Sequence, residues 1–447
     1  MIENIGDWQR THYSKQVKPE MGNEEVIVMG WVRELRDLGK LKFIKLADRE
    51  GFIQVTAKEG DVKPDIINKI EGLGREDVIA VKGIVKASKQ APNGIEIMPV
   101  DVRILNTSDS PLPLELETKK TPAHIDTRMN WRFLDLRKHE NNLIFKIQTA
   151  MEMAMREFWI KNGFIEIHSP KLMGSQSETG AELFTVVYFD REAYLAQSPQ
   201  FYKQLAMIAG FDRVFEIAPV FRANPSHTVR HDTEYTSIDM EMSWISSHED
   251  VMAFEEKWIT YVIEQVKKQY GDKIKETFGF ELVVPKIPFP RMTLKEAKDK
   301  IKKTGKKVSY KEDLSPEEER LLGELVKEES GHEFVFVTEF PWKIKPFYHM
   351  RDEKNPGVTK GFDLLWKGLE VTTGSQREHR YDVLVEQAKE KKLKLDSIKS
   401  YLDFFRYGAP PHGGLGFGLT RALMTMFEMK NVREVTFAFR DMDRLYP

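Results

Sequence analysis

The sequence predicts an α+β protein with two domains, an N-terminal β-barrel and a larger domain whose antiparallel sheet is flanked by helices. Residues 24–107 hold five short runs of strand-forming residues, with one helical run between the third and the fourth. This order is typical of an OB-fold barrel. After residue 130 the strand-like and helical runs do not alternate regularly, which favours an antiparallel sheet over repeated βαβ units.

Length and composition limit the number of domains and the kinds of site that the chain can contain. A chain of 447 residues is too long for one typical core, and we expect a barrel domain at 1–107, a linker at 108–130 and a second domain at 131–447. The chain has no cysteine, which excludes disulfides and thiolate metal sites. It lacks both an apolar run of about 18 residues that could cross a membrane and a signal-peptide pattern, so we expect a cytoplasmic protein.

The barrel carries a local concentration of positive charge, although the net charge of the whole chain is −2. Phe43 lies within a segment that contains many cations, namely Arg33, Arg36, Lys40, Lys42, Lys45 and Arg49. Aromatic rings mixed with cations are typical of surfaces that stack and steer single-stranded bases. The alternative is a small barrel with a solvated charged rim and with Phe43 in its core.

A helix and a strand follow the linker. Apolar residues between 144 and 158 recur at helical spacing, and Gly163 stands where a C-terminal cap belongs. Residues 164–168 then alternate as a strand before Pro170. These segments bury apolar surface, either inside the domain or against a second subunit.

Residues 213–244 predict an antiparallel pair of strands joined by a short polar connection. Arg222, Arg230, Tyr235 and Asp239 could then line one surface. Such a surface suits a nucleotide and an amine: cations for phosphates, an acid for an ammonium group and a ring for a base. The alternative is an ordinary hairpin with a charged solvent face.

The remaining runs predict helices at 246–272, 293–330 and 420–430 and strands at 333–381. The lysine-rich run at 298–307 is expected to be a solvated face. The last helix is entered through HGGLGFG at 412–418. This glycine-rich segment lacks the Lys-Ser/Thr ending of a P-loop.

Three segments together resemble the signature motifs of class II aminoacyl-tRNA synthetases, in the same order and spacing. They are the helix, strand and proline of 144–170, FRANPSHTVRHDTEY at 221–235 and HGGLGFGLTR at 412–421. The preceding barrel places the resemblance among the aspartyl, asparaginyl and lysyl enzymes, and the resemblance covers essentially the whole chain. It implies a ligase that uses ATP, Mg²⁺ and tRNA, and that is commonly a homodimer.

Within that group the chain is most similar to the aspartyl enzymes. QSPQFYKQ at 197–204 resembles their signature, in which Lys203 receives the substrate's side-chain carboxylate, and GAELF at 180–184 is also of their type. In the family Arg377 forks onto the same carboxylate. Two cations suit an anionic ligand, whereas an asparagine amide would leave one of them unpaired in a dry pocket.

The resemblance assigns further roles by position. The aspartate site would consist of Glu178, Ser198, Gln200, Lys203, Asp239 and Arg377. Arg222 would hold the α-phosphate and Arg421 the γ-phosphate, which makes them the catalytic pair. The other ATP contacts would be Arg230, His231, Tyr235, which stacks on adenine, and Glu370. Magnesium would be held by Asp363, Glu370 and Thr373, and the anticodon by Arg36, Phe43, Gln54 and Pro92.

The chain departs from the family pattern at three positions. Asn224 replaces a glutamate near the expected tRNA acceptor end, Thr373 replaces a commoner serine, and Thr420 stands where an acid is frequent. We expect an aspartate–tRNA ligase that forms aspartyl-adenylate from ATP and then charges the 3′ end of tRNA-Asp. The alternatives are an asparaginyl-tRNA synthetase and a non-catalytic tRNA-binding relative.

The choice of tRNA depends on the loop at 88–94. Aspartyl enzymes with relaxed tRNA choice tend to have a proline like Pro92 there, where stricter ones have a lysine. A proline supplies neither a long cationic side chain nor a backbone donor. This favours charging of tRNA-Asn as well as tRNA-Asp, although Arg33 fits neither pattern cleanly.

Overall fold

The computed structural model describes residues 2–117, 123–175, 183–225 and 228–446. The chain forms two compact units, the barrel unit Met1–Asn142 and the large unit Leu143–Pro447. The domain limits proposed from the sequence, at 107 and 130, stay predictions. Among the described residues no helix is long and apolar enough to cross a membrane.

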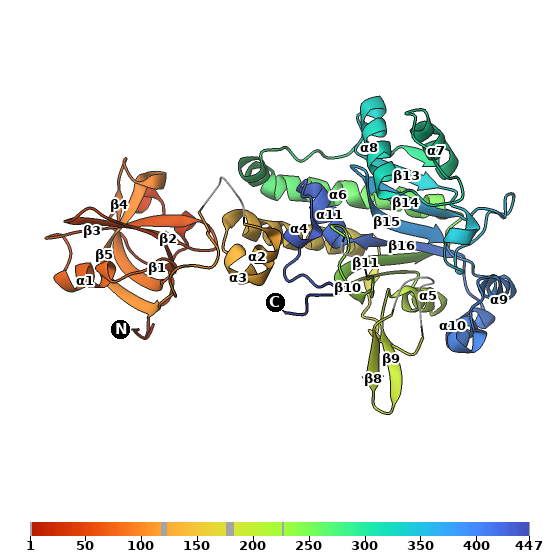
Figure 1. Cartoon of the computed structure of the whole chain (residues 1–447), viewed down its shortest axis with the longest axis horizontal. Helices are drawn as coiled ribbons and strands as arrows, with labels where there is room; N and C mark the ends of the chain where they lie inside the picture. Colours follow the sequence, from red (N-terminus) through yellow and green to blue (C-terminus); the bar gives the residue numbers. More distant parts are fainter. Residues whose placement is uncertain (1, 118–122, 176–182, 226–227, 447) are drawn as a thin grey trace. The chain divides into compact units, whose positions relative to one another are not determined.

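The barrel unit contains the predicted OB-fold barrel (Figure 1). Its strands are β1 (Glu25–Asp37), β2 (Leu41–Ala47), β3 (Phe52–Lys58), β4 (Val78–Ala87) and β5 (Ile95–Asn106). They close in the order β1-β2-β3-β5-β4, and α1 (Pro64–Glu71) lies between β3 and β4 in the chain. Buried aliphatic side chains from all five strands and α1 fill the barrel, as their period-two alternation requires. Helices α2 (Ile125–Asn130) and α3 (Arg132–Asp135) complete the unit.

The large unit is built on an eight-stranded sheet in the order β12-β13-β14-β15-β16-β11-β10-β6. The strands are β6 (Ile165–Glu166), β10 (Arg213–Phe221), β11 (Glu234–Ser243), β12 (Arg291–Thr293), β13 (Phe334–Thr338), β14 (Gly361–Trp366), β15 (Leu369–Gln376) and β16 (His412–Gly418). The two outermost pairs are parallel and the pairs between them are antiparallel. The predicted α+β class is therefore confirmed.

Helices pack around this sheet, and several of them cover its faces (Figure 1). They are α4 (His139–Lys161), α5 (Gln200–Ile208), α6 (His248–Phe278), α7 (Leu294–Lys302), α8 (Pro316–Ser330), α9 (Tyr381–Glu390), α10 (Lys399–Phe404) and α11 (Leu419–Met426). An aromatic core joins α4 and α6 to the sheet: the ring of Trp159 lies 4.8 Å from that of Trp258 and 4.6 Å from that of Phe215.

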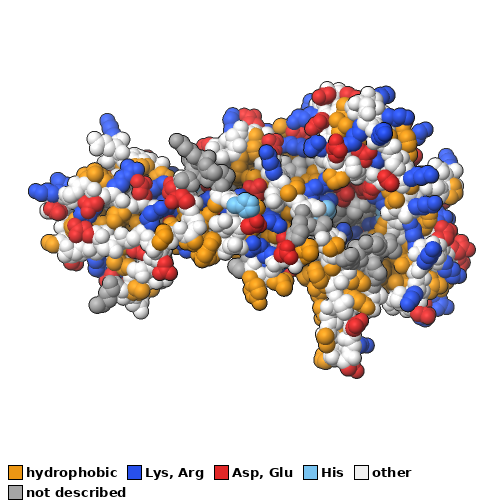
Figure 2. Space-filling view, viewed as in Figure 1, with side chains coloured by type: hydrophobic (Ala, Val, Ile, Leu, Met, Phe, Trp, Pro, Cys, Tyr) orange, Lys and Arg blue, Asp and Glu red, His pale blue; other side chains and the backbone are white. Residues whose placement is uncertain are grey.

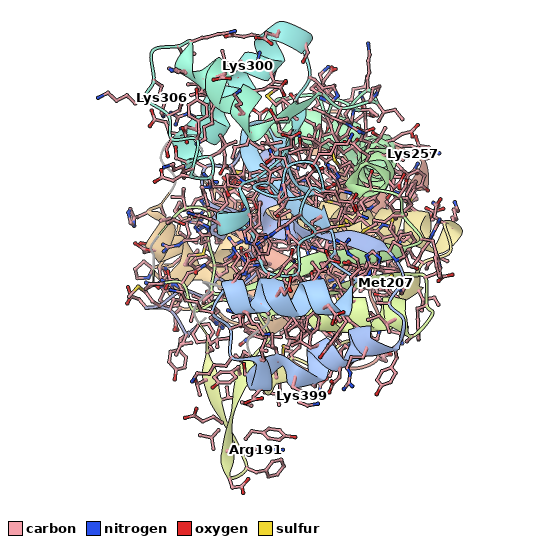
Figure 3. All side chains as sticks on the ribbon, turned by 90° about the vertical axis from the view of Figure 1, so that its right-hand side faces the viewer. Arg191, Met207, Lys257, Lys300, Lys306 and Lys399 are labelled. Atoms are coloured by element: carbon pink, nitrogen blue, oxygen red, sulfur yellow. The ribbon has the colours of Figure 1, made fainter. Side chains whose placement is uncertain are left out.

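The predicted helix at 293–330 is two helices. Gly305, with φ of 90°, follows the end of α7, and Pro316 begins α8 at a position where its missing N–H costs nothing. The lysine run is also not uniformly solvated. Lys298 is buried and donates to Glu318 and to the Asp313 carbonyl, whereas Lys300 and Lys306 lie at the periphery (Figure 3).

A small sheet projects from the large unit. It consists of β7 (Leu172–Met173), β9 (Arg191–Leu195) and β8 (Thr185–Tyr188) in that order. Hydrophobic side chains gather on its β8–β9 hairpin in the space-filling view (Figure 2), and Val187 and Phe189 are exposed there. The opposite end of the unit carries Lys300 and Lys306 (Figure 3).

Candidate functional site

A cavity of about 340 Å³ opens on the large unit and collects nearly all of the predicted site residues. It is lined by Ser198, Gln200, Lys203, Arg222, Arg230, His231, Tyr235, Asp239, Asp363, Glu370, Thr373, Arg377 and Arg421. Asn224 and Thr420 line it as well. Glu178 lies outside the described residues. The structure therefore brings together side chains that are far apart in the sequence, from Ser198, just before α5, to Arg421 on α11.

The predicted hairpin forms one wall of the cavity. Strands β10 and β11 pair antiparallel, from Arg213 opposite Met242 to Phe221 opposite Glu234. Successive side chains of a strand point to opposite faces, so Tyr235 and Asp239 share the cavity face of β11. Ile238 and Met240, on the other face, are completely buried. This alternation explains why the hairpin is both a core element and a polar surface.

The glycine-rich strand β16 makes room for the acids of β11. In the sheet Gly414 lies opposite Glu241, and Gly416 lies opposite Asp239. A Cβ atom at Gly414 would clash with the Met240 carbonyl oxygen and with the Glu241 carboxylate, and a Cβ atom at Gly416 would lie 3.2 Å from Asp239 Oδ1. These glycines therefore allow two carboxylates to pack against the strand.

Glu241 connects the two cations that were predicted to face aspartate. Arg377 donates to it from Nε at 2.9 Å and from Nη2 at 3.3 Å, and Lys203 Nζ lies 3.4 Å from its Oε2. Lys203 also donates to Asp239 Oδ1 at 3.0 Å and to the Leu415 carbonyl at 2.9 Å. Burial raises the pKa of Glu241, but Arg377 and Lys203 outweigh it and leave the pKa below its ordinary value. Glu241 is thus a charged anchor for both cations.

A neutral hydrogen-bond network lies beside this cluster. The Gln204 amide nitrogen is 2.9 Å from His412 Nε2, and Tyr401 donates to the Gln204 carbonyl at 2.9 Å. His412 Nδ1 lies 2.8 Å from the Pro410 carbonyl oxygen, so it carries the proton and Nε2 accepts. Burial lowers the pKa of His412 to about 4. The network therefore fixes α5, which carries Lys203, without adding charge.

Cations gather at the other end of the cavity. The Arg222 guanidinium lies 5.8 Å from the centre of the Tyr235 ring, and Arg421 Nη1 donates to the Glu370 carboxylate at 3.2 Å. Burial, together with Arg421 and Arg230, lowers the pKa of His231 to about 4. His231 is therefore neutral near pH 7, and the positive charge comes from the arginines. This concentration of charge suits phosphate groups.

Asp363 and Glu370 provide the acidic oxygens of the cavity. Lys345 donates to both oxygens of Asp363, at 2.9 and 2.7 Å, and Thr373 donates to Oδ1 at 2.6 Å. Burial raises the pKa of Asp363 to about 7, Lys345 opposes this shift and Glu370 adds to it. The two carboxylates therefore repel each other. No group of three or more acidic, His or Cys side chains suited to a metal occurs among the described residues.

Three functional candidates were not predicted from the sequence: Glu241, Lys345 and Glu319. Glu241 has the same strand parity as Asp239, and that parity could have revealed it. Lys345 follows the short η4 helix (Trp342–Ile344), and Glu319 lies on α8. Neither segment belongs to a motif, so no local pattern points to these two residues.

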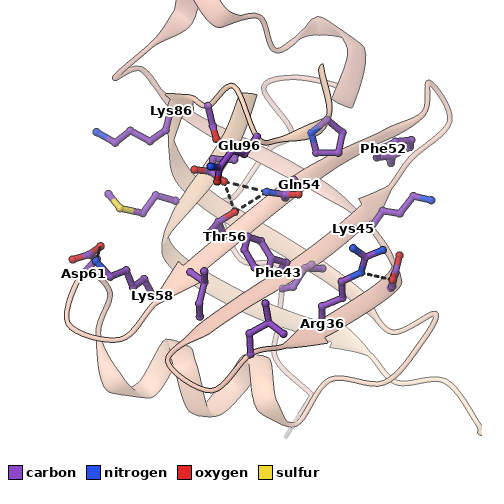
Figure 4. Close-up of a pocket in the computed structure, with 18 residues that line it drawn as sticks. Arg36, Phe43, Lys45, Phe52, Gln54, Thr56, Lys58, Asp61, Lys86 and Glu96 are labelled. Carbon is purple, nitrogen blue, oxygen red and sulfur yellow. Dashed lines mark hydrogen bonds and ion pairs between the residues drawn. The ribbon is translucent and has the colours of Figure 1, made fainter. Parts of the chain in front are cut away.

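A second cavity, of about 820 Å³, opens on the barrel unit and is lined by the four residues predicted to meet an anticodon (Figure 4). These are Arg36, Phe43, Gln54 and Pro92. Gln54, Thr56 and Glu96 form a hydrogen-bonded group on its wall. The half-buried Phe43 lies opposite Arg36 in the sheet. Phe43 is thus on the cavity side and not among the buried residues of the barrel core.

Arg33 does not line this cavity. It is buried on β1, where its guanidinium lies 3.3 Å from Glu76 and 3.7 Å from Glu117. Arg137 donates to the same Glu76 at 2.8 Å. Arg33 is therefore part of an internal ion-pair network, and Pro92 is the more direct candidate for base selection.

Comparison with known proteins agrees with this geometry. A family model described as tRNA synthetases class II (D, K and N) matches residues 124–441, and a model of an OB-fold nucleic acid binding domain matches residues 26–105. The aspartate–tRNA(Asp/Asn) ligase of Methanocaldococcus jannaschii is 47% identical over 440 residues, which cover 98% of this chain and 99% of that protein. The aspartate–tRNA(Asp) ligase of Thermococcus kodakarensis is 44% identical over 438 residues, covering 98% and 100%.

Solved structures are similar over the same length. An asparaginyl-tRNA synthetase from Pyrococcus horikoshii complexed with asparaginyl-adenylate matches with a TM-score of 0.91 and 31% identity, covering 98% of this chain and 100% of that one. An aspartyl tRNA synthetase from Entamoeba histolytica matches with a TM-score of 0.90 and 29% identity, covering 100% and 96%. The fold is therefore shared by relatives that differ in the amino acid named.

Proposed function

The chain belongs to the class II tRNA synthetases of the D, K and N group, and we propose that it is an aspartate–tRNA ligase. It activates L-aspartate with ATP to aspartyl-adenylate, releases pyrophosphate and transfers aspartate to the 3′ end of tRNA-Asp. The observation that carries the choice of aspartate is the buried cluster in which Glu241 holds both Lys203 and Arg377.

The two cations bind the side-chain carboxylate of the substrate. Arg377 keeps its fork geometry because Glu241 and Ser375 hold the guanidinium, with Nη1 donating to Ser375 at 2.8 Å. Lys203 adds a point charge from α5. A neutral asparagine side chain would replace one anionic oxygen by an amide that donates, and a donor facing two cations is strongly disfavoured.

The other groups position the reacting atoms. Asp239 and Glu178 take the α-ammonium group, with Ser198 and Gln200 beside it, and Tyr235 stacks on adenine. Arg222 holds the α-phosphate, while Arg230, His231 and Arg421 face the outer phosphates. The substrate α-carboxylate then attacks the α-phosphorus and pyrophosphate leaves, so no protein nucleophile is needed. Catalysis consists of alignment and of fixed positive charge that meets the developing negative charge.

Mg²⁺ fits the acidic end of the cavity. Mg²⁺ is usually held by one or two carboxylates together with phosphate oxygens and water, and the mutually repelling Asp363 and Glu370 supply two such oxygen donors. Thr373 and Lys345 fix the orientation of Asp363. When bound, the ion would neutralise phosphate charge. The protein's own part is to hold these carboxylates where the triphosphate lies.

The decisive assay is ATP–pyrophosphate exchange, which requires only the activation step. We expect exchange that depends on aspartate and that is reduced at least 100-fold by Arg222→Ala or by Arg421→Ala, in line with the loss of a charged transition-state contact. Exchange that survives either substitution would overturn the site assignment. An absence of exchange with any amino acid would favour the non-catalytic tRNA-binding alternative.

We also propose that both tRNA-Asp and tRNA-Asn are charged. Relatives of both kinds are similar to this chain: the Methanothermobacter thermautotrophicus and Methanopyrus kandleri proteins, at 46% and 47% identity, are named aspartate–tRNA(Asp/Asn) ligase, and the Pyrococcus abyssi protein, at 46%, is named aspartate–tRNA(Asp) ligase. Pro92 on the wall of the barrel cavity supports the wider choice, because it offers neither a cationic side chain nor an N–H to a base. Charging of the two purified tRNAs with aspartate tests this directly.

A homodimer is the proposed assembly. Four exposed apolar side chains lie on the first motif and the strand that follows it: Met153, Ile160, Ile165 and Leu172. Exposed apolar side chains on these segments support an interaction surface there. Sedimentation should give a dimer, and an active monomer would contradict the proposal. The cytoplasm, which suits a chain without cysteine, is the proposed compartment.

A further inference from the structure

Glu319 lies on α8, outside the segments that carry the family motifs, and yet it bridges two parts of the phosphate end of the cavity. Arg230 Nη2 donates to Glu319 Oε2 at 2.7 Å, and the backbone N–H of Glu370 donates to the same oxygen at 3.2 Å. The side chain of Glu319 is only 8% exposed. One buried carboxylate therefore ties the loop after β10 to strand β15.

The position of α8 is fixed by close backbone packing. A Cβ atom at Gly323 would clash with the backbone of Gly368, and a Cβ atom at Gly368 would lie 2.6 Å from Arg320 Cα. Gly368 has a φ of 74° and begins the return into β15. The helix thus rests directly on the turn between β14 and β15. This contact places Glu319 beside Glu370 with little freedom to move.

Glu370 is held from both sides as a result. Its N–H donates to Glu319, and its carbonyl oxygen accepts from Arg421 Nη1 at 3.1 Å. Arg230 lines the cavity whereas Glu319 does not. Among the described residues, Arg230 Nε has no hydrogen-bond partner. Glu319 therefore holds Arg230 through Nη2, while the Arg230 side chain lines the cavity.

We infer that Glu319 is a positioning residue of the ATP site, which sets Arg230 and the Glu370 backbone for the triphosphate. The inference rests on the proposed function, because it assumes that phosphates occupy this end of the cavity. Glu319 acts through Arg230 and Glu370 and does not touch the substrate itself. If Glu319 positions Arg230, its removal weakens ATP binding. If Glu319 only competed with phosphate for Arg230, its removal would tighten ATP binding.

The test compares Glu319→Gln with Glu318→Gln. Glutamine keeps the size of Glu319 and an oxygen for the Glu370 N–H but loses the charge that holds Arg230. Glu318 is a matched control: it is the neighbouring buried glutamate of α8, and it accepts from Lys298 at 3.0 Å. We expect Glu319→Gln to raise the KM for ATP in exchange about tenfold, because a neutral acceptor holds Arg230 less firmly than a carboxylate, with the KM for aspartate unchanged.

Stability and coupling separate positioning from a structural role. Glu318→Gln should lower the melting temperature while leaving the KM for ATP unchanged, and Glu319→Gln combined with Arg230→Ala should raise that KM no further than Arg230→Ala alone. Equal changes in both KM values, an additive double variant or tighter ATP binding in Glu319→Gln would each overturn the inference. The variants can also be compared by equilibrium binding of ATP without any amino acid. If aspartate failed to support exchange, the proposed substrate would be refuted, but the role of Glu319 could still be tested in this way.

Discussion

Glu241 accepts two hydrogen bonds from Arg377, at 2.9 Å from Nε and 3.3 Å from Nη2, at a place where the glutamate is completely buried. Such a pair is costly to desolvate unless further partners compensate it. Lys203 supplies that compensation through ion pairs with both Glu241 and Asp239. The cluster thus contains two cations and two carboxylates. The cluster is therefore built to hold charge at a fixed position, which is the requirement for binding a carboxylate.

The first prediction concerns this anchor. In Glu241→Gln the new amide group would face Arg377 or Lys203 with a donor, so both cations lose their fixed positions. We expect kcat/KM for aspartate to fall at least 100-fold, about 3 kcal/mol, while ATP affinity stays the same. Glu256→Gln is the control, because Glu256 is also buried and accepts from Arg291 at 2.8 Å away from the cavity. An equal loss in both variants would remove the special role of Glu241.

The second prediction concerns the glycines of β16, which leave space for the carboxylates of β11. In Gly414→Ala the added Cβ would meet the Met240 carbonyl oxygen and the Glu241 carboxylate, so strand or side chain must shift. We expect the free energy of unfolding to fall by about 2 kcal/mol or more, together with a loss of aspartate activation. Gly416→Ala, whose Cβ would lie 3.2 Å from Asp239 Oδ1, should cost less in urea unfolding. The reverse order would refute this packing account.

The third prediction concerns pH. Glu255 lies on α6, beside the Thr372 hydroxyl of β15. Burial raises the pKa of Glu255 from its usual value of 4.5 to about 8. The folded state then keeps a proton that the unfolded state releases between these two values, so stability falls as pH rises through that range. Glu255→Gln, which does not titrate, should come closest to the wild type near pH 4, below both pKa values.

At pH 8 the same variant should be the more stable protein, by at least about 1.4 kcal/mol, the equivalent of one pKa unit. Urea unfolding of both proteins at the two pH values checks this. A stability difference that does not change with pH would mean that folding does not raise the pKa of Glu255.

The fourth prediction concerns the tRNA. Pro92→Lys places a long cation on the wall of the barrel cavity, where the side chains of Phe43 and Gln54 also lie. We expect the ratio of kcat/KM for tRNA-Asn to that for tRNA-Asp to fall several-fold, with ATP–pyrophosphate exchange unchanged because activation needs no tRNA. Measured aminoacylation of both tRNAs provides the ratio. No change in the ratio would locate the discrimination elsewhere.

How far the sequence predicts this structure depends on whether a feature is local. The alternation along β11 is a local property, and it correctly predicts the hairpin and the shared face of Tyr235 and Asp239. The partners that arrive from distant segments leave no such trace. Glu319 meets Arg230 across 89 positions of the chain, and only the packing of α8 on the β14–β15 turn brings the two together.

Burial of charge is the other feature that the pattern hides. A lysine-rich run predicts a solvated face, and this is wrong for Lys298, because Glu318 and the Asp313 carbonyl provide a buried site for its ammonium group. Likewise Arg33 belongs to a cationic segment of the barrel, but it is buried in an ion pair with Glu76. A cation's partners, and not its neighbours in the sequence, decide whether it is available to a ligand.

Whether Lys203 and Arg377 select aspartate can be decided by ATP–pyrophosphate exchange with aspartate and with asparagine, measured in the wild type and in Lys203→Leu. Lys203 and Arg377, both held by Glu241, predict rapid exchange with aspartate, at least about 1,000-fold slower exchange with asparagine, and loss of the aspartate reaction in Lys203→Leu with ATP binding retained. Exchange with asparagine at a comparable rate, or an aspartate reaction that survives without Lys203, would contradict the account.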